Sequence, residues 1–117
     1  RPYVGLAADA ATPASGLSGG MRRRLSLAIA VVGDPKVIYL DEPGAGLDPN
    51  SRWRLWRVVQ SLKAGRTVIL TTHDMEEADA LADRVAVMAN GRLRAVGAPL
   101  QLKTALGTGY RLKVVLA

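Results

Sequence analysis

The sequence predicts an α/β domain built on a parallel sheet, followed by an antiparallel β-hairpin. Two short apolar runs, KVIYLD at 36–41 and GRTVILTT at 65–72, alternate with segments of helical periodicity, an order typical of a sheet with flanking helices. Unbroken apolar runs of this length predict strands that are buried on both faces of a parallel sheet. The 117 residues, 49% of them hydrophobic, are long enough for one modest core and too short for two.

The first helix is predicted to run from Ser18, its N-cap, to Val32, where the Gly-Asp-Pro sequence at 33–35 stops it. Residues 1–16 are rich in Ala, Gly and Pro, and we expect a frayed helix end followed by a loop there. The second half of the helix is apolar nearly all round and is therefore expected to be buried. One apolar face follows helical spacing, with Met21, Leu25, Ile29 and Val32.

A second helix is predicted from Asp48, an N-cap followed by Pro49 at the first helical position, to about Lys63. Its expected inner stripe consists of Leu55, Trp56, Val59 and Leu62. Its arginines are expected outside this stripe or at its edge, at positions Arg52, Arg54 and Arg57.

The remaining sequence predicts a third helix, a hairpin and two short C-terminal elements. Asp74 is the expected cap of the third helix, and Glu77, three residues later, is expected to complete a capping box. The dipeptide Asn90-Gly91 between two short apolar runs is a strong hairpin signal. Residues 98–107 predict a short helix, and residues 110–117 predict a last strand.

The composition bears on several classes of protein. The sequence has no cysteine, which excludes disulfide frameworks and cysteine-based metal sites. No apolar run reaches the roughly 18–20 residues that cross a bilayer. The formal net charge of +6 is compatible with nucleic acid, an anionic membrane or a phosphate ligand, and equally with an ordinary positive surface. Aromatic residues make up only 4% and no recognition motif is present, so we expect no nucleic-acid partner.

Two adjacent carboxylates, Asp41 and Glu42, follow the first predicted strand, and ligand sites of open α/β sheets lie at the carboxyl ends of strands. Because side chains alternate along a strand, one carboxylate could hold hydrated Mg²⁺ while the other orients or deprotonates a water. His73, the single histidine of the sequence, ends the second strand at the equivalent height and could bind a phosphate oxygen or that water. A polar loop and a surface histidine are the simpler alternatives.

Gly19 and Gly20 open the first predicted helix, which indicates a close approach of backbone amides to an anion. The helix N-terminus carries about half a positive charge and free N–H groups, and Ser18 adds a hydroxyl. A tight turn would explain the two glycines as well. The arginines at 22–24 cover about 300° of the helix circumference and cannot all point at one ligand. No phosphate-binding loop of the form GxxxxGK[ST] occurs in the 117 residues.

In order and spacing, these motifs resemble the ATP-binding domain of ABC transporters over residues 16–106. LSGGM at 17–21 is similar to the signature loop, with Met21 where glutamine is commoner. VIYLD at 37–41 is similar to Walker B. The downstream sequences RVAVMANGRL and VGAP also fit this family.

The same resemblance assigns catalytic and communicating positions. Glu42 stands at the position of the catalytic glutamate, and His73 at that of the switch histidine. Gly44 stands where threonine or serine is common, a small departure that is expected to loosen the loop. The D-loop corresponds to Ala45, Gly46, Leu47 and Asp48.

The resemblance implies how these residues would share ATP. ABC ATP-binding domains work as head-to-tail pairs, so residues 18–21 would bind the γ-phosphate of an ATP held by a second ATP-binding domain. Asp41 would hold Mg²⁺ through water, and Glu42 and His73 would act on the ATP bound in their own domain. Asp48 would communicate between the two sites.

The fold implied by the resemblance is an incomplete P-loop NTPase (ABC-type ATPase) domain, with a mainly parallel sheet, flanking helices, a C-terminal β-hairpin and the Walker A half missing. Residues 1–33 would end a helical subdomain that carries the signature motif. Residues 34–106 would hold Walker B, the D-loop and the switch histidine, and residues 107–117 would begin a C-terminal extension. Because the Walker A lysine, the adenine-stacking aromatic and the Q-loop glutamine lie upstream in the family order, we expect this chain alone to be inactive.

Three stretches look most like the A subfamily, which is associated with lipid movement: residues 18–49, 65–84 and 102–114. The implied function is ATP hydrolysis, with ATP and Mg²⁺ as cofactors, coupled to transmembrane transport of lipids. The implied partners are a second ATP-binding domain and the transmembrane domains of a parent transporter, which would hold this domain on the cytoplasmic side of the membrane. A soluble ABC-type ATPase acting on DNA or ribosomes, and a non-catalytic truncated product, are the alternatives.

Overall fold

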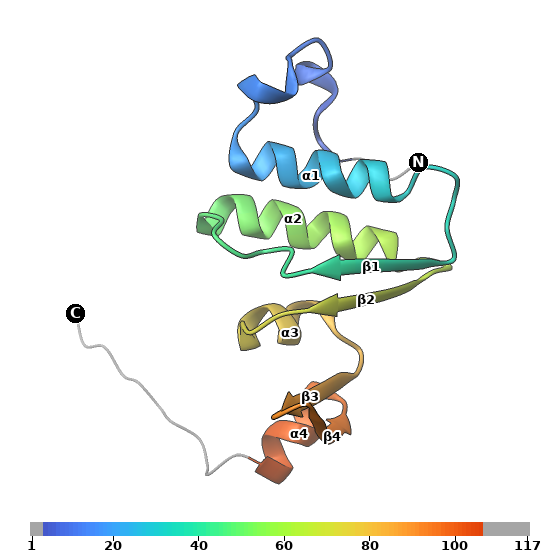
Figure 1. Ribbon diagram of the computed structural model, residues 1–117, viewed down its shortest axis with the longest axis vertical. Helices are drawn as coiled ribbons and strands as arrows, with labels where there is room; N and C mark the ends of the chain where they lie inside the picture. Colours follow the sequence, from blue (N-terminus) through green and yellow to red (C-terminus); the bar gives the residue numbers. More distant parts are fainter. Residues whose placement is uncertain (1–3, 107–117) are drawn as a thin grey trace, which may run out of the picture. The chain divides into compact units, whose positions relative to one another are not determined.

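In the computed structural model, which describes residues 4–106, the chain divides between Leu81 and Ala82 into two units. Within those residues the first unit contains η1 (Ala7–Asp9), η2 (Ala14–Gly16), α1 (Gly19–Ala30), β1 (Val37–Asp41), α2 (Pro49–Leu62), β2 (Thr67–Thr71) and α3 (Met75–Leu81). The second unit contains β3 (Val85–Ala89), β4 (Arg92–Gly97) and α4 (Pro99–Leu106) (Figure 1). The predicted α/β class, with parallel strands and helices, is confirmed.

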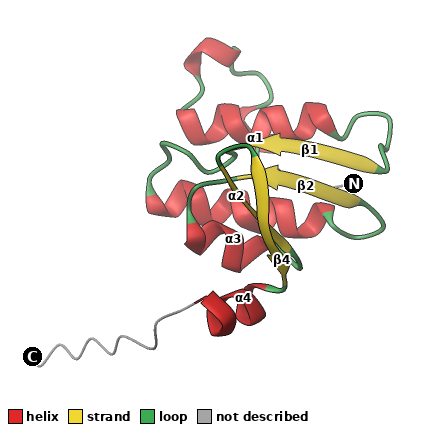
Figure 2. Cartoon of the chain, turned by 60° about the horizontal axis from the view of Figure 1, so that its bottom comes forward, coloured by secondary structure: helices red, strands yellow, loops and turns green. Residues whose placement is uncertain are grey.

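The strands β1 and β2 pair in parallel, and Figure 2 shows them side by side and pointing the same way. Their register sets Val37 opposite Thr67 at one end and Asp41 opposite Thr71 at the other. Because both strands run in one direction, the residues that follow them emerge at the same edge of the sheet. This edge carries the acidic pair and the histidine.

Among the described residues of the first unit, the strand pair packs on one face only, so the expectation that both strands are buried on both faces is wrong there. The side chains packed into the core are Ile38, Leu40, Val68 and Leu70. The apolar side chains left exposed are Val37, Tyr39 and Ile69. The core residues of α1, α2 and α3 pack against the inward-facing side chains of the two strands. The strands β1 and β2, although apolar throughout in sequence, therefore alternate between side chains that face the core and side chains that are exposed.

The helix α1 turns a different face to the core from the one its apolar spacing predicts. Its buried residues are Gly20, Arg24 and Leu27. Ile29 and Val32, which we expected to be buried, are 65% and 78% exposed. The reason is a close approach to α2: a Cβ built on Gly20 would lie 2.8 Å from the hydroxyl oxygen of Ser51. The glycine therefore faces α2, and the predicted stripe is rotated towards solvent.

The helix α2 supplies most of the core, and here the predicted inner stripe is confirmed. Its buried residues are Leu55, Trp56, Val58, Val59 and Leu62. Leu27 of α1, Ile38 of β1 and Leu81 of α3 pack around them. Arg54 and Arg57 are exposed as expected, whereas Arg52 is half-buried.

The other elements follow the predictions in part. Two 3₁₀ turns, η1 and η2, replace the frayed helix expected before residue 17. The strands β3 and β4 form the predicted antiparallel hairpin, with φ of +51° at Asn90 and +69° at Gly91, the left-handed values that a two-residue turn requires. The helix α4 is confirmed, and the strand predicted for 110–117 lies outside the described residues. Within 4–106, no helix combines the length and apolar character needed to cross a membrane.

Replacing Gly20 by alanine should lower the free energy of unfolding by about 1–3 kcal/mol, because the added methyl group overpacks the contact with Ser51. Gly19→Ala is the matched control, since a Cβ at Gly19 meets nothing within 4 Å. Alanine at that position should be neutral or stabilising by up to about 1 kcal/mol. Urea unfolding measures both variants, and adding Ser51→Gly to Gly20→Ala should restore part of the loss. Equal destabilisation by the two alanines would contradict this packing.

Candidate active site

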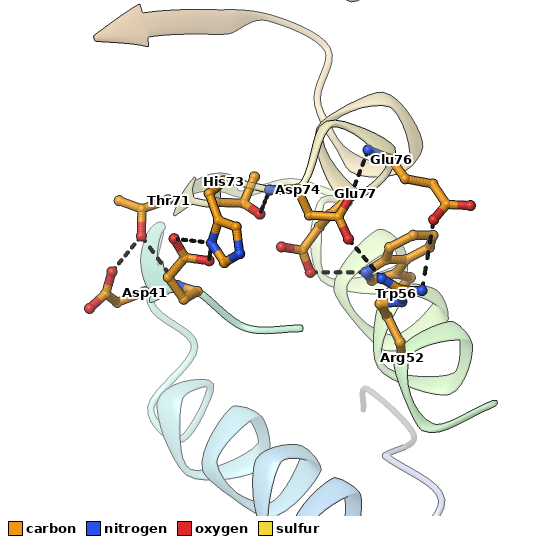
Figure 3. A network of polar contacts seen from close by, with 10 residues as sticks. Asp41, Arg52, Trp56, Thr71, His73, Asp74, Glu76 and Glu77 are labelled. Atoms are coloured by element: carbon orange, nitrogen blue, oxygen red, sulfur yellow. Dashed lines mark hydrogen bonds and ion pairs between the residues drawn. The ribbon is translucent and has the colours of Figure 1, made fainter. Parts of the chain in front are cut away.

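The parallel register brings four polar residues together where β1 and β2 end. The amide N–H of Glu42 donates to the Thr71 carbonyl at 3.1 Å and to the Thr71 hydroxyl oxygen at 3.2 Å. The Thr71 hydroxyl in turn donates to Oδ1 of Asp41. Figure 3 shows Thr71 in contact with Asp41, with the His73 ring nearby on the segment that follows β2. The acidic pair and the histidine that the sequence singled out are therefore neighbours in space.

Glu42 has a backbone conformation that a non-glycine residue rarely adopts, with φ of +46°. Such a left-handed residue costs free energy and persists where its surroundings hold it. Here the two hydrogen bonds from its amide to Thr71 provide that restraint. The turn it makes separates the two carboxylates: Asp41 contacts Thr71, whereas the Glu42 side chain contacts His73.

Nδ1 of His73 lies 3.0 Å and 3.1 Å from the two carboxylate oxygens of Glu42. The hydrogen bond and the charge of Glu42 raise the pKa of His73 above its ordinary value, because both stabilise the imidazolium form. The ring is 82% exposed, so it can reach a ligand from solvent. The pair is thus arranged to exchange a proton or to orient a polar group.

The site fits a hydrated magnesium ion that is partly held by phosphate oxygens. Within residues 4–106, no three carboxylate or imidazole side chains gather to hold a metal ion by themselves. Magnesium in nucleotide sites usually needs only one or two carboxylates, because phosphates and water complete its octahedral shell. Oδ1 of Asp41 is bound by Thr71, and in the described part of the chain its Oδ2 has no hydrogen-bond partner.

The start of α1 is capped as predicted, with the Ser18 Oγ accepting from the Met21 amide at 3.2 Å. The two glycines that follow differ: Gly19 is open, whereas Gly20 is buried against Ser51. A packing contact therefore explains Gly20, and Gly19 keeps room for a ligand beside the helix N-terminus. No hydrogen bond or ion pair in the described residues links this end of α1 to Glu42.

The loop from Ala45 to Asp48 joins the acidic pair to α2. Gly46 has φ of +72° and is exposed, and Leu47 packs against the core. Asp48 caps α2 as predicted, since its carboxylate accepts from the Ser51 amide at 3.0 Å. Hydrogen bonding from Ser51 also holds the pKa of Asp48 below its ordinary value. The loop is thus fixed at both ends, because Glu42 is held by β2 and Asp48 by α2.

Comparisons with known proteins bear on this arrangement. Residues 7–79 match the family model described as "AAA domain, putative AbiEii toxin, Type IV TA system". The chain is 53% identical over 107 residues to ABC transporter A family member 9 of Arabidopsis thaliana, a match that covers 92% of this chain and 11% of that protein. It is 54% identical over 102 residues to retinal-specific phospholipid-transporting ATPase ABCA4 of Homo sapiens, covering 87% of this chain and 4% of that protein.

The chain belongs to the ATP-binding domain family of ABC transporters. Relatives matched at 52–54% identity are A-family members, which confirms the resemblance found in the sequence. The chain spans about a tenth of the length of the plant relatives, 11% for the first of them.

The candidate site has a buried support that the sequence does not predict. Glu77 is 1% exposed, and its Oε1 accepts a hydrogen bond from Nε1 of Trp56 at 2.9 Å. Asp74 caps α3 as predicted, since its Oδ1 accepts from the Glu76 amide at 2.8 Å. The capping box that Glu77 was expected to complete is wrong, because the Asp74 amide donates to the Thr72 hydroxyl at 3.0 Å and Glu77 points to α2 instead. The available signal was Trp56 itself: a tryptophan on an inner stripe needs an acceptor for its N–H.

A second contact ties the same segments together on the outside. Arg52 of α2 forms an ion pair with Asp74 at 2.7 Å, and hydrogen bonds from backbone amides, chiefly that of Glu76, lower the pKa of Asp74. Gly44 is buried beneath this region, and a Cβ built there would collide with the Glu77 carboxylate. Close packing therefore accounts for the glycine where this family commonly has threonine or serine.

Glu42→Gln should lower the pKa of His73 towards its ordinary value of 6.5, because the charge that stabilises the imidazolium is removed. Glu76→Gln is the control, since Glu76 pairs with Arg52 at 3.7 Å and does not contact the ring. NMR titration of the His73 ring measures both. The raised pKa means that the pair stabilises the fold below the ordinary histidine value, and that this contribution is lost as pH rises through the raised value. An unchanged His73 pKa in Glu42→Gln would contradict the pairing.

Trp56→Phe should reduce the free energy of unfolding by about 1–3 kcal/mol, because it keeps a ring in the core but removes the N–H that serves the buried Glu77 carboxylate. Trp53→Phe makes the same chemical change on the same helix at a side chain that is 60% exposed. That control should alter stability by less than about 0.5 kcal/mol. Denaturant unfolding compares the two, and similar losses would argue against a specific Trp56–Glu77 bond.

Proposed function

We propose that this chain is part of an ATP-binding domain that hydrolyses ATP in an ABC transporter of the A family. The observation that carries the proposal is the meeting of Asp41, Glu42 and His73 at the carboxyl ends of two parallel strands. Phosphoryl transfer needs positioned charge more than covalent chemistry from the protein, and this edge provides two carboxylates and an imidazole in fixed places.

In this mechanism Glu42 orients the attacking water and accepts its proton. The contact with His73 holds the Glu42 carboxylate in place, and the exposed ring offers a hydrogen bond to the γ-phosphate. Asp41 contributes a carboxylate oxygen to the hydrated magnesium ion that accompanies ATP. That ion, when bound, neutralises charge that develops on the phosphate oxygens.

Residues 18–21 are proposed to serve an ATP held by a second ATP-binding domain. Gly19 is open beside a capped helix N-terminus, where backbone N–H groups favour an anion. The tight packing of Gly20 on Ser51 places this helix against the one capped by Asp48. A movement of the D-loop, residues 45–48, would therefore displace α1, and a movement of α1 would displace the D-loop.

The exposed sheet face supports the proposal that further parts of a P-loop NTPase domain, including its Walker A half, cover this unit. Parallel sheets are normally covered on both faces, whereas Tyr39 on β1 is 74% exposed. We keep the proposed division into 1–33, 34–106 and 107–117 for the helical, catalytic and C-terminal parts. Without a GxxxxGK[ST] loop to cradle the phosphates, the 117 residues alone are not expected to hydrolyse ATP.

The proposed cargo is lipid, and the proposed partners are a second ATP-binding domain and the transmembrane domains of the parent, with this domain on the cytoplasmic side of the membrane. The support comes from relatives: the human protein matched at 54% identity carries the name of a phospholipid-transporting ATPase. The plant relatives are named as members of the same A family.

In the intact transporter, Glu42→Gln should reduce ATP turnover by about 10²–10⁴-fold, the usual contribution of a positioned general base. Glutamine keeps the shape of the side chain, so nucleotide-driven pairing of the two ATP-binding domains should persist. Phosphate release measures turnover, and cross-linking of the paired domains measures association. Glu76→Gln, an exposed carboxylate outside the site, should leave both near wild type. Near-normal turnover in Glu42→Gln would remove Glu42 from this role.

A further inference from the structure

The last residue of β2, Thr71, touches both members of the acidic pair. It lies opposite Asp41 in the parallel register, donates its hydroxyl hydrogen to Oδ1 of that residue, and accepts the Glu42 amide with its hydroxyl oxygen and its carbonyl. We propose that Thr71 is a positioning residue for the phosphoryl-transfer site: its hydroxyl orients the Asp41 carboxylate towards Mg²⁺ and fixes the backbone of Glu42. This inference rests on the proposed ATPase function.

Elementary hydrogen-bond accounting fixes the direction of each contact. A carboxylate can only accept, so the single hydroxyl hydrogen of Thr71 is the one that reaches Asp41. The lone pairs of the same oxygen remain for the Glu42 amide at 3.2 Å. One hydroxyl therefore joins two residues whose side chains are proposed to do different work. Valine has nearly the same shape and can make neither contact.

The two contacts serve two needs of the site. Oδ1 of Asp41 is held by Thr71, which leaves Oδ2, unpartnered within residues 4–106, to face a water of the metal shell. Glu42 has φ of +46°, a conformation that persists where its surroundings hold it. The two hydrogen bonds that its amide makes, both to Thr71, provide this restraint. Loss of the hydroxyl should thus free one carboxylate to rotate and let the backbone of the other relax.

The plain alternative is that Thr71 is only a β-branched residue that suits a strand. Thr67 begins the same strand four residues earlier, so its side chain lies on the same face of the sheet, and it is also exposed. Among the described residues its hydroxyl has no hydrogen-bond partner, and its amide donates to the Lys36 carbonyl at 2.9 Å. Thr67→Val therefore makes the same chemical change without touching the acidic pair.

The test compares Thr71→Val, Thr71→Ser and Thr67→Val in the intact transporter. Removing an outer hydrogen-bond partner of a metal-binding side chain typically costs about 10- to 100-fold in metal affinity or activity. Thr71→Val should raise the half-saturating Mg²⁺ concentration for ATP hydrolysis by about that factor, and serine should restore most of it. Hydrogen–deuterium exchange in the nucleotide-free protein gives a readout apart from activity, and the Glu42 amide should exchange at least tenfold faster in Thr71→Val alone.

The proposal is overturned if Thr71→Val matches Thr67→Val in both readouts, or if Thr71→Ser is as impaired as valine, since serine keeps the hydroxyl. The serine comparison also decides the question if the valine variant folds poorly. A failure of the proposed function looks different: wild-type transporter would not hydrolyse ATP, or Glu42→Gln would hydrolyse it normally. The exchange rate of the Glu42 amide would still report whether Thr71 holds it.

Discussion

The parallel pairing of β1 with β2 is the constraint on which the rest of the site depends. Its register sets Asp41 opposite Thr71, so the residues after each strand emerge at one edge of the sheet. From that edge Glu42 reaches back to Thr71 through its amide and forward to His73 through its carboxylate. A slip of one residue would turn the side chains of one strand to the opposite face and separate every one of these contacts. The chemistry is thus encoded in strand register as much as in the identities of the polar residues.

Much of the fold could be predicted because the deciding interactions are local in the sequence. The caps at Ser18 and Asp48 each bind an amide three residues on, and the hairpin depends on the left-handed preference of Asn90-Gly91. The inner stripe of α2 could be predicted because the apolar residues at helical spacing are also the residues that are buried. The proximity of Asp41, Glu42 and His73 also followed from sequence, since parallel strands end at a common edge. Only this last inference depended on residues far apart in the sequence, and it needed no more than the pairing of two adjacent parallel strands.

The misses all depend on partners that spacing alone does not reveal. The helix α1 turns Gly20 towards α2 because a glycine leaves room for Ser51 of that helix. This packing contact decides the orientation of α1, and the apolar residues Ile29 and Val32 are left exposed. The strands are apolar on both faces, yet the helices of the described unit pack on one of them. Glu77 follows a capping-box pattern, but the buried N–H of Trp56 takes its carboxylate. Leaving the buried Trp56 N–H without an acceptor would cost more free energy than leaving an amide free at an exposed helix end, because water can bind the exposed amide.

The segment after β2 gains its position from several other elements at once. His73 contacts Glu42 beyond β1, Asp74 pairs with Arg52 on the flank of α2, and Glu77 binds Trp56 in the interior of that helix. The first of these bonds is largely exposed and raises the pKa of His73 above its ordinary value, whereas the last is buried. The histidine can therefore exchange its partner for a ligand without displacing the segment that carries it, since the Glu77 bond remains. A rigid support beneath an exposed, proton-sensitive contact is what a site needs if it must respond to a phosphate and then return to its starting geometry.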